Sequence, residues 1–209
     1  MMRRTRSIPG LPSMSHAGVH LLGLAGVLTL AGCSSGSGRA ASAISGLDEA
    51  HSLARRAYEN DDTIRAQQLY LASVEAYPSF ASAWNNLGVL LMEDGRRPDA
   101  DEAFAAAAQI DQTDPRPVYN RGLMRHRLGR LGEARAFYAA ALERDPNYVD
   151  ALMGHIECEI TDGVGTSDTI ERIDRAMRLQ RDEAALNQLQ LQRFRLLDEL
   201  DSASSVSSR

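Results

Sequence analysis

The sequence predicts an all-α fold, a right-handed α-solenoid of about four helix-turn-helix units followed by a capping helix. Three observations predict it. Residue types recur every 34 positions over most of the chain, apolar residues within each period follow helical spacing, and turn residues divide each period in two. The composition agrees, because the chain is rich in alanine and its 23 basic residues are all arginine, and both are good helix formers.

Residues 1–32 are predicted to be an export signal. Three arginines near the start precede an apolar run, residues 21–30, which is too short to cross a bilayer core of about 30 Å as a permanent helix. Leu30-Ala31-Gly32-Cys33 follows, and it resembles the lipobox of bacterial lipoprotein precursors. That resemblance implies cleavage before Cys33, attachment of a diacylglycerol to its thiol and acylation of the new amine, with fatty-acid chains such as palmitate. The alternative is an ordinary signal peptide with a chance cysteine.

The segment after the lipobox sets the expected location and reach of the protein. Ser34 stands where an aspartate is typical of retention at the inner membrane, so the resemblance implies the periplasmic face of an outer membrane. Residues 33–46 combine the lipidated cysteine with small polar residues that have no periodic pattern, and we expect a flexible tether there.

Residues 47–182 divide into four windows of the repeat: 47–80, 81–114, 115–148 and 149–182. At an offset of 34 residues, Gly88 aligns with Gly122. Three further sets of residues recur at the same spacing. They are the alanines Ala66, Ala100 and Ala134, the aromatic residues Tyr70, Phe104 and Tyr138, and the turn glycines Gly95, Gly129 and Gly163. The glycines predict helix ends in a left-handed conformation and close helix approach.

These windows resemble the tetratricopeptide repeat, whose signature is W-x2-L-G-x2-Y, then A-x3-F, then P. Trp84-x2-Leu87-Gly88 and Ala100-x3-Phe104 reproduce it in the second window, and the third is similar. The fourth window is degenerate, because Gly165 and Thr166 indicate a one-residue insertion. The resemblance implies hairpins that stack on their neighbours around a continuous core.

Residues 183–200 are predicted to be the capping helix. Its apolar residues fall on one side of a helical wheel: Leu186, Leu189, Phe194, Leu196, Leu197 and Leu200. This side either covers the last repeat or forms the seam of a homodimer. Residues 201–209 are rich in serine and are predicted to be disordered.

Nothing in the sequence indicates an enzyme, a cofactor or a metal site. His51, His126 and His155 are scattered over three repeats, and no phosphate loop, nucleophile elbow or metalloprotease helix is present. Cys158 is expected to be a buried thiol within a helix. The formal net charge of −5 argues against binding of nucleic acid.

The tetratricopeptide resemblance implies a groove lined by the first helices of the repeats, which binds an extended peptide or a helix of a partner. The matching positions are Asn85, Asn86, Val89, Met92, Arg116, Tyr119, Asn120, Leu123, His126 and Arg127. Asparagine amides can pair with a peptide backbone, and Arg116, Arg127 and Arg130 favour an acidic segment or a terminal carboxylate. In the alternative interpretation, the asparagines satisfy local groups and the arginines are solvated.

The chaperone-binding members of the family hold a terminal carboxylate with a lysine–asparagine clamp. Asn85 stands in the lysine position here, which argues against that ligand. The function we expect is a non-catalytic, lipid-anchored adaptor at the cell envelope, in pilus or secretion-system assembly. Alternatives are an adaptor that tethers peptidoglycan-modifying enzymes, a ligand-binding or catalytic lipoprotein with its site in the fourth repeat, and a cytoplasmic adaptor.

Overall fold

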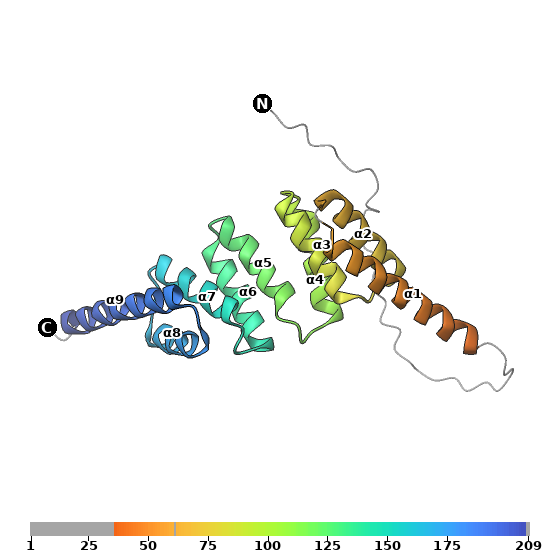
Figure 1. The fold of residues 1–209 in the computed structure, drawn as a ribbon. Helices are drawn as coiled ribbons and strands as arrows, with labels where there is room; N and C mark the ends of the chain where they lie inside the picture. The colour runs from red at the N-terminus through yellow and green to blue at the C-terminus, as the bar shows by residue number, and fades with distance from the viewer. Residues whose placement is uncertain (1–35, 61, 208–209) are drawn as a thin grey trace, which may run out of the picture. The chain divides into compact units, whose positions relative to one another are not determined.

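The computed structural model describes residues 36–60 and 62–207, with side chains described over 46–60 and 62–203. Nine α-helices and no strand occur in this part of the chain (Figure 1). They are α1 (Gly36–Tyr58), α2 (Thr63–Ala76), α3 (Ala81–Glu93), α4 (Arg97–Ile110), α5 (Arg116–Arg127), α6 (Leu131–Arg144), α7 (Val149–Thr161), α8 (Ser167–Leu179) and α9 (Glu183–Ser207). Each helix packs mainly on its neighbours along the chain, which confirms the all-α solenoid of helical hairpins.

Glycine ends the first helix of three hairpins, as the sequence predicts. Gly95, Gly129 and Gly163 have φ of 79°, 70° and 65°. At the α3–α4 turn, the amide of Arg96 donates to the carbonyl of Leu91 at 2.9 Å, and the amide of Gly95 donates to that of Met92 at 3.1 Å. The other two turns repeat this pattern, so unpaired helix-end carbonyls are satisfied in the same way in each hairpin.

Two glycines allow the helices of the middle hairpins to approach closely. A Cβ atom built on Gly88 of α3 would lie 2.7 Å from the ring of Phe104 on α4. One built on Gly122 of α5 would lie 2.9 Å from the ring of Tyr138 on α6. Both aromatic side chains are buried, so the predicted pairing of a small residue with an aromatic residue is confirmed in these hairpins.

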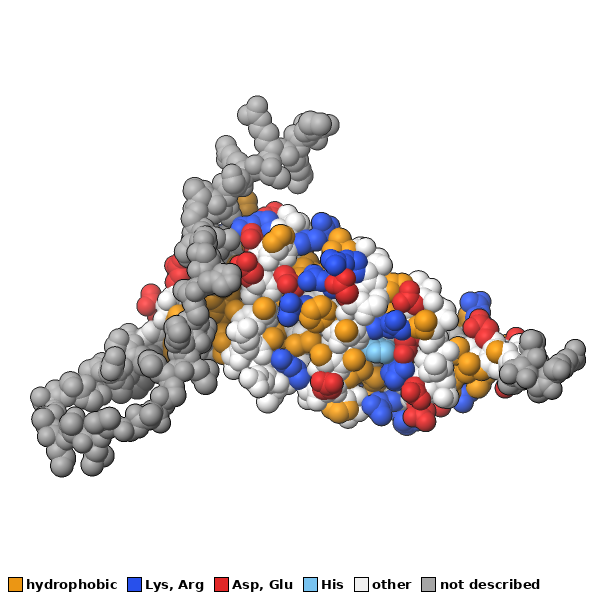
Figure 2. Space-filling model, turned by 180° about the vertical axis from the view of Figure 1, so that it is seen from behind, with side chains coloured by type: hydrophobic (Ala, Val, Ile, Leu, Met, Phe, Trp, Pro, Cys, Tyr) orange, Lys and Arg blue, Asp and Glu red, His pale blue; other side chains and the backbone are white. Residues whose placement is uncertain are grey.

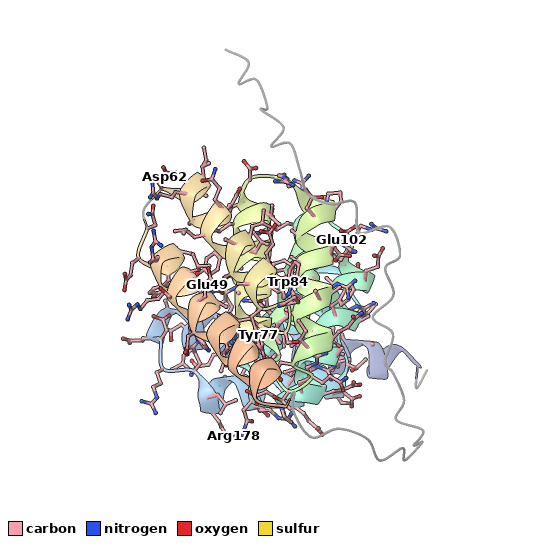
Figure 3. The ribbon with its side chains drawn as sticks, turned by 90° about the vertical axis from the view of Figure 1, so that its right-hand side faces the viewer. Glu49, Asp62, Tyr77, Trp84, Glu102 and Arg178 are labelled. Atoms are coloured by element: carbon pink, nitrogen blue, oxygen red, sulfur yellow. The ribbon has the colours of Figure 1, made fainter. Side chains whose placement is uncertain are left out.

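The first hairpin has no turn glycine and begins its second helix with a side-chain cap. The Asp62 carboxylate accepts hydrogen bonds from the amides of Ile64 and Arg65 (Figure 3). Ser73 of α2 donates from its hydroxyl to the carbonyl of Ala50 in α1 at 2.9 Å, inside the core. A helix cap and a buried hydrogen bond therefore support α1 and α2, whose window matches the repeat signature less well than the two middle windows do.

The fourth hairpin, α7–α8, is present but packs less extensively than the middle hairpins. In the aromatic column its residue is Ile173, one position later than the period predicts, which places the insertion in the α7–α8 turn. Thr166 and Thr169 form a capping box at the start of α8. Helix α9 covers this hairpin with Leu189 and Leu196, which are buried in one cluster with Ile173. This confirms a capping role for α9.

Three details differ from the sequence predictions. Helix α1 begins at Gly36, so residues 36–46 are helical where a tether is predicted, in keeping with the alanines among them. Helix α9 continues to Ser207 through most of the predicted disordered tail. Phe194 is 68% exposed although the helical wheel places it with the buried leucines, because α9 touches the hairpin along a narrower strip than the wheel assumes.

The predicted signal peptide and Cys33 lie outside the described residues. Among the helices that are described, none is both long and apolar enough to span a bilayer.

Candidate protein-binding surface

The predicted asparagines form a row of hydrogen bonds across three helices. Asn86 donates from its amide to the Tyr70 hydroxyl at 3.1 Å, and Asn85 donates to the Asn86 side-chain oxygen at 3.3 Å. Asn120 of α5 donates to the Asn85 side-chain oxygen at 3.0 Å. Asn85 is 5% exposed, so it lies beneath the surface and orients its two neighbours. Asn86 and Asn120 are half-buried and lie nearer the surface.

Helix α5 carries the apolar part of the predicted groove. Tyr119 is half-buried, with its ring centre 5.6 Å from that of Tyr138 and 5.4 Å from that of Tyr148 in an edge-on arrangement. His126 places its Nδ1 atom 3.3 Å from the Tyr138 hydroxyl. Leu123 lies between Tyr119 and His126 in the sequence and is also half-buried. Three groove positions of α5 are thus held at the surface beside a tyrosine cluster.

Burial and charge both act on this cluster. Desolvation raises the pKa of Tyr119, with a further contribution from the carboxylates of Asp150 and Glu157, while Arg127 acts in the opposite direction. Desolvation also raises the pKa of Tyr138 and Tyr148. The three phenols therefore stay neutral over the physiological range. The half-buried Tyr119 and Tyr148 contribute hydrogen-bonding, weakly polar surface, and the buried Tyr138 supports them.

Only one of the predicted groove arginines is without an ion-pair partner among the described residues. Arg116 is paired with Asp114, with nitrogen–oxygen distances of 2.8 to 3.1 Å. Arg130 pairs with Glu133 at 2.7 Å. Arg127 is exposed and makes no such pair with any described side chain. The cationic surface predicted from three arginines is therefore concentrated on Arg127.

The structure adds residues that the sequence reasoning missed. Tyr148 precedes α7 and joins the tyrosine cluster, and Asp150 and Glu157 bring negative charge from α7. The pattern of repeats assigns groove positions to the first helices of the second and third windows. Tyr148 is the last residue of the third window, outside its first helix, and Asp150 and Glu157 belong to the fourth window. Basic and acidic side chains are also interspersed, without a large patch of one sign, on the face shown in Figure 2.

The two apolar positions predicted on α3 have a packing role as well. Val89 and Met92 are half-buried and pack against the core cluster that contains Leu87 and Phe104. Part of each side chain therefore belongs to the fold, and the remaining part is exposed at the surface of the second repeat.

The other groups with possible chemistry are held in structural roles. Cys158 is fully buried, and burial raises the pKa of its thiol to about 11. His51 stacks near Phe80 with ring centres 4.5 Å apart. No group of three or more His, Cys, Asp or Glu residues among those described could hold a metal ion.

The architecture defines a class of protein, a stack of helical hairpins with a shared period and turn geometry. A family model described as Tetratricopeptide repeat matches residues 51–115 and 118–149. These residues span most of the first three hairpins, and the fourth hairpin continues the stack. The matched part of the chain therefore consists of tetratricopeptide repeats, and this fold is a scaffold for protein–protein interaction.

Solved structures share this fold at low sequence identity. The Arabidopsis OM64 TPR domain has 19% identity and a TM-score of 0.52, and the match covers 56% of this chain and 98% of that domain. The first TPR of Spaghetti (RPAP3), bound to the HSP90 peptide SRMEEVD, has 18% identity and a TM-score of 0.52, with 56% and 95% covered. MamA has 16% identity and a TM-score of 0.50, with 69% and 92% covered. No curated protein matches the chain.

Proposed function

We propose that this chain is a lipid-anchored adaptor that binds envelope proteins at the periplasmic face of the outer membrane, without catalysis. The observation that carries the proposal is the surface of α5, where Leu123, His126 and the unpaired Arg127 lie beside the tyrosine cluster and the Asn85–Asn120 hydrogen bond. Apolar, aromatic and amide groups in one row suit an extended peptide or a helix. The RPAP3 domain, solved with a bound peptide, supports such use of this fold.

Arg127 is the one predicted groove arginine that has no ion-pair partner among the described side chains, and this limits the charge expected of the partner segment. Arg127 can pair with one carboxylate, while Asp150 and Glu157 on the neighbouring repeat disfavour a run of acidic residues. Asn85 is neutral and buried, so it cannot act as the lysine of a carboxylate clamp. We infer a partner segment with apolar side chains and one acidic residue, bound mainly through contact with Tyr119 and Leu123.

The groove is tested by changing side chains that do not support the fold. We expect the double variant Leu123→Ala with Arg127→Glu to recover several-fold less partner from cross-linked envelopes, with an unchanged melting temperature. Arg97→Glu, the same charge reversal at an exposed position of α4, is the matched control. Equal recovery by the double variant and the control would exclude this surface. Asn120→Ala is unsuitable, because it leaves the buried Asn85 oxygen without its donor.

The anchor is tested separately. Cys33 follows a lipobox-like sequence, and we expect Cys33→Ser to abolish incorporation of labelled palmitate and to release the chain from the membrane fraction. Cys158→Ser is the matched control, because that thiol is buried within α7. Unchanged labelling of Cys33→Ser would remove the lipid anchor from the proposal and leave the groove untouched.

The identity of the captured proteins decides between the two envelope roles. Pilus or secretin components recovered by the wild type and lost by the double variant would support a role in pilus or secretion-system assembly. Peptidoglycan-modifying enzymes recovered in the same way would support the tethering alternative.

A further inference from the structure

A cleft of about 540 Å³ opens between α6 and α8, away from the α5 surface just described. Three of its lining residues are apolar, Ala139, Leu142 and Leu152, and the half-buried His155 of α7 lines it as well. Its rim is charged, with Glu143 on one side and Asp168, Glu171, Arg172 and Arg175 of α8 on the other. The described residues leave this space open, although part of its lining is apolar.

The preceding junction, between α4 and α6, shows what occupies such a space in this molecule. There Phe137 of α6 lies under two guanidinium groups, with Arg121 4.6 Å and Arg125 5.7 Å from the ring centre. Arg121 also pairs with Asp101 of α4 at 3.0 Å. An aromatic ring flanked by arginine and carboxylate groups therefore fills the junction.

The position that Phe137 occupies carries no aromatic ring one repeat later. Counting 34 residues from Arg121 leads to His155, and counting 35 from Phe137, because of the inserted residue, leads to Arg172. The Arg172 side chain turns to Glu159 of α7, with nitrogen–oxygen distances of 2.5 and 3.1 Å. The place that an aromatic side chain fills in one junction is thus left open in the next.

An exposed aromatic side chain is present on α9. Phe194 is 68% exposed and Leu191 is 50% exposed, on the side of α9 opposite the buried Leu196. Phe194 precedes the buried Leu196 by two positions, which correspond to about 200° around a helix. Phe194 therefore points away from the hairpin that α9 covers. Arg195 beside it is exposed and makes no ion pair with a described residue, whereas the cleft rim offers the exposed carboxylates of Asp168 and Glu171.

We propose that the cleft between α6 and α8 receives Phe194 of a second copy of this chain, with Arg195 of that copy beside Asp168 and Glu171. The open position is the one that the Phe137 ring fills in the preceding junction, so it offers a place for an exposed aromatic side chain. The carboxylates of the rim are complementary in charge to Arg195. A two-fold arrangement lets each copy give and receive one Phe194, which doubles the contact. This proposal does not depend on the α5 groove or on the lipid anchor.

The contact is tested directly by placing a photo-reactive phenylalanine analogue at position 194 of the full-length chain in cells. We expect a covalent dimer on denaturing gels, with cross-linked peptides from residues 139–143 or 168–175 of the other copy. The same analogue at Tyr58, which is 82% exposed at the opposite end of the repeats, is the matched control. Absence of a covalent dimer, or cross-links to any other segment, would overturn the proposal.

Substitutions test how much Phe194 and the charged residues contribute to the association of two copies. Phe194→Ala removes an anchoring aromatic side chain, so we expect it to weaken co-purification of two differently tagged copies about ten-fold. Tyr58→Ala should leave the co-purification unchanged. Glu171→Arg and Arg195→Glu should each weaken the association, and the double variant should restore it, because the swapped charges again pair. Association that is unaffected by Phe194→Ala, or a double variant no better than either single one, would contradict the proposed contact.

Discussion

The two middle hairpins and the fourth hairpin are built from the same repeat but packed differently. In α3–α4 and α5–α6, a glycine of the first helix meets an aromatic ring of the second, Gly88 with Phe104 and Gly122 with Tyr138. In α7–α8, the position of this glycine is occupied by Ile156, and the residue in the aromatic column is Ile173, so the hairpin has no such pairing. Gly154, two residues before Ile156, instead meets the ring of Tyr138 in the preceding hairpin. Helix α7 is therefore packed tightly toward α6 and loosely toward α8.

Polar groups occupy the looser side of α7. The positions of Leu87 and Leu91 in α3, both buried, correspond to His155 and Glu159 in α7. Glu159 is buried and bonded to Arg172, and His155 Nδ1 lies 3.4 Å from its carboxylate. One repeat can therefore replace apolar packing by an ion pair and still stack, provided that the charges are paired.

The largest expected loss of stability comes from a substitution in one of the two tightly packed middle hairpins. Any side chain at position 122 would place its Cβ atom 2.9 Å from the Tyr138 ring and 3.1 Å from the Phe137 Cβ atom. Gly122→Leu therefore forces a large side chain into a space that is already filled. We expect a loss of about 3 kcal/mol in the free energy of unfolding, measured by urea denaturation. Gly132→Ala is the control, because its Cβ meets nothing within 4 Å and alanine favours helix. Equal stability of the two variants would contradict the tight packing.

A smaller loss in the free energy of unfolding is expected for a variant on the polar side of α7. Arg172→Ala leaves the Glu159 carboxylate buried with only His155 nearby, and we expect a cost of about 2 kcal/mol in the same measurement. Arg175→Ala is the matched control, because Arg175 is exposed on the same helix. If the two variants unfold at the same urea concentration, the ion pair does not stabilise the α7–α8 hairpin.

The same ion pair predicts a dependence of stability on pH. Burial alone raises the pKa of Glu159, but His155 and Arg172 outweigh it, so the pKa in the folded protein lies below its ordinary value of 4.5. A lowered folded-state pKa contributes stability above the unfolded value, and this stability is lost as the pH falls through the folded value. We expect the melting temperature of Glu159→Gln to fall less steeply in acid than that of the wild type. Parallel acid profiles of the two proteins would contradict this assignment.

The smallest expected effect concerns the tight side of α7. Cys158 is fully buried in the cluster that contains Tyr138, and burial raises its pKa to about 11. In the Cys33→Ser background, the thiol should fail to react with Ellman's reagent at neutral pH until denaturant unfolds the chain. Rapid reaction in native buffer would show that α7 is loose on both sides.

Most of the fold follows from the sequence because its signals are local or periodic. Turn glycines, the Gly88 and Gly122 column and the aromatic column each recur at a fixed spacing, and each needs only its own hairpin to be satisfied. The exposed side of α9 does not follow in this way. A helical wheel gives the direction of Phe194, but the width of the surface that α9 covers depends on α8.

The candidate site is predicted only in part. The α5 positions follow from the repeat, yet the burial of Asn85 depends on Asn120 one repeat away, and the pairing of Arg116 with Asp114 depends on loop geometry. Tyr148 was missed because it precedes α7 rather than lying on a predicted groove helix. Contacts between repeats, which vary from one repeat to the next, are what the period alone leaves undetermined.

The loose fit of α8 has a consequence for how the molecule opens. In a linear stack, a hairpin is held only by the units beside it, and an end unit with weak coupling frays before the interior does. Amide protons of α8 and α9 should therefore exchange with solvent sooner than those of α3 to α6. Whatever clamps the C-terminal helix will suppress that fraying, so protection of these amides reports occupancy at the end of the array.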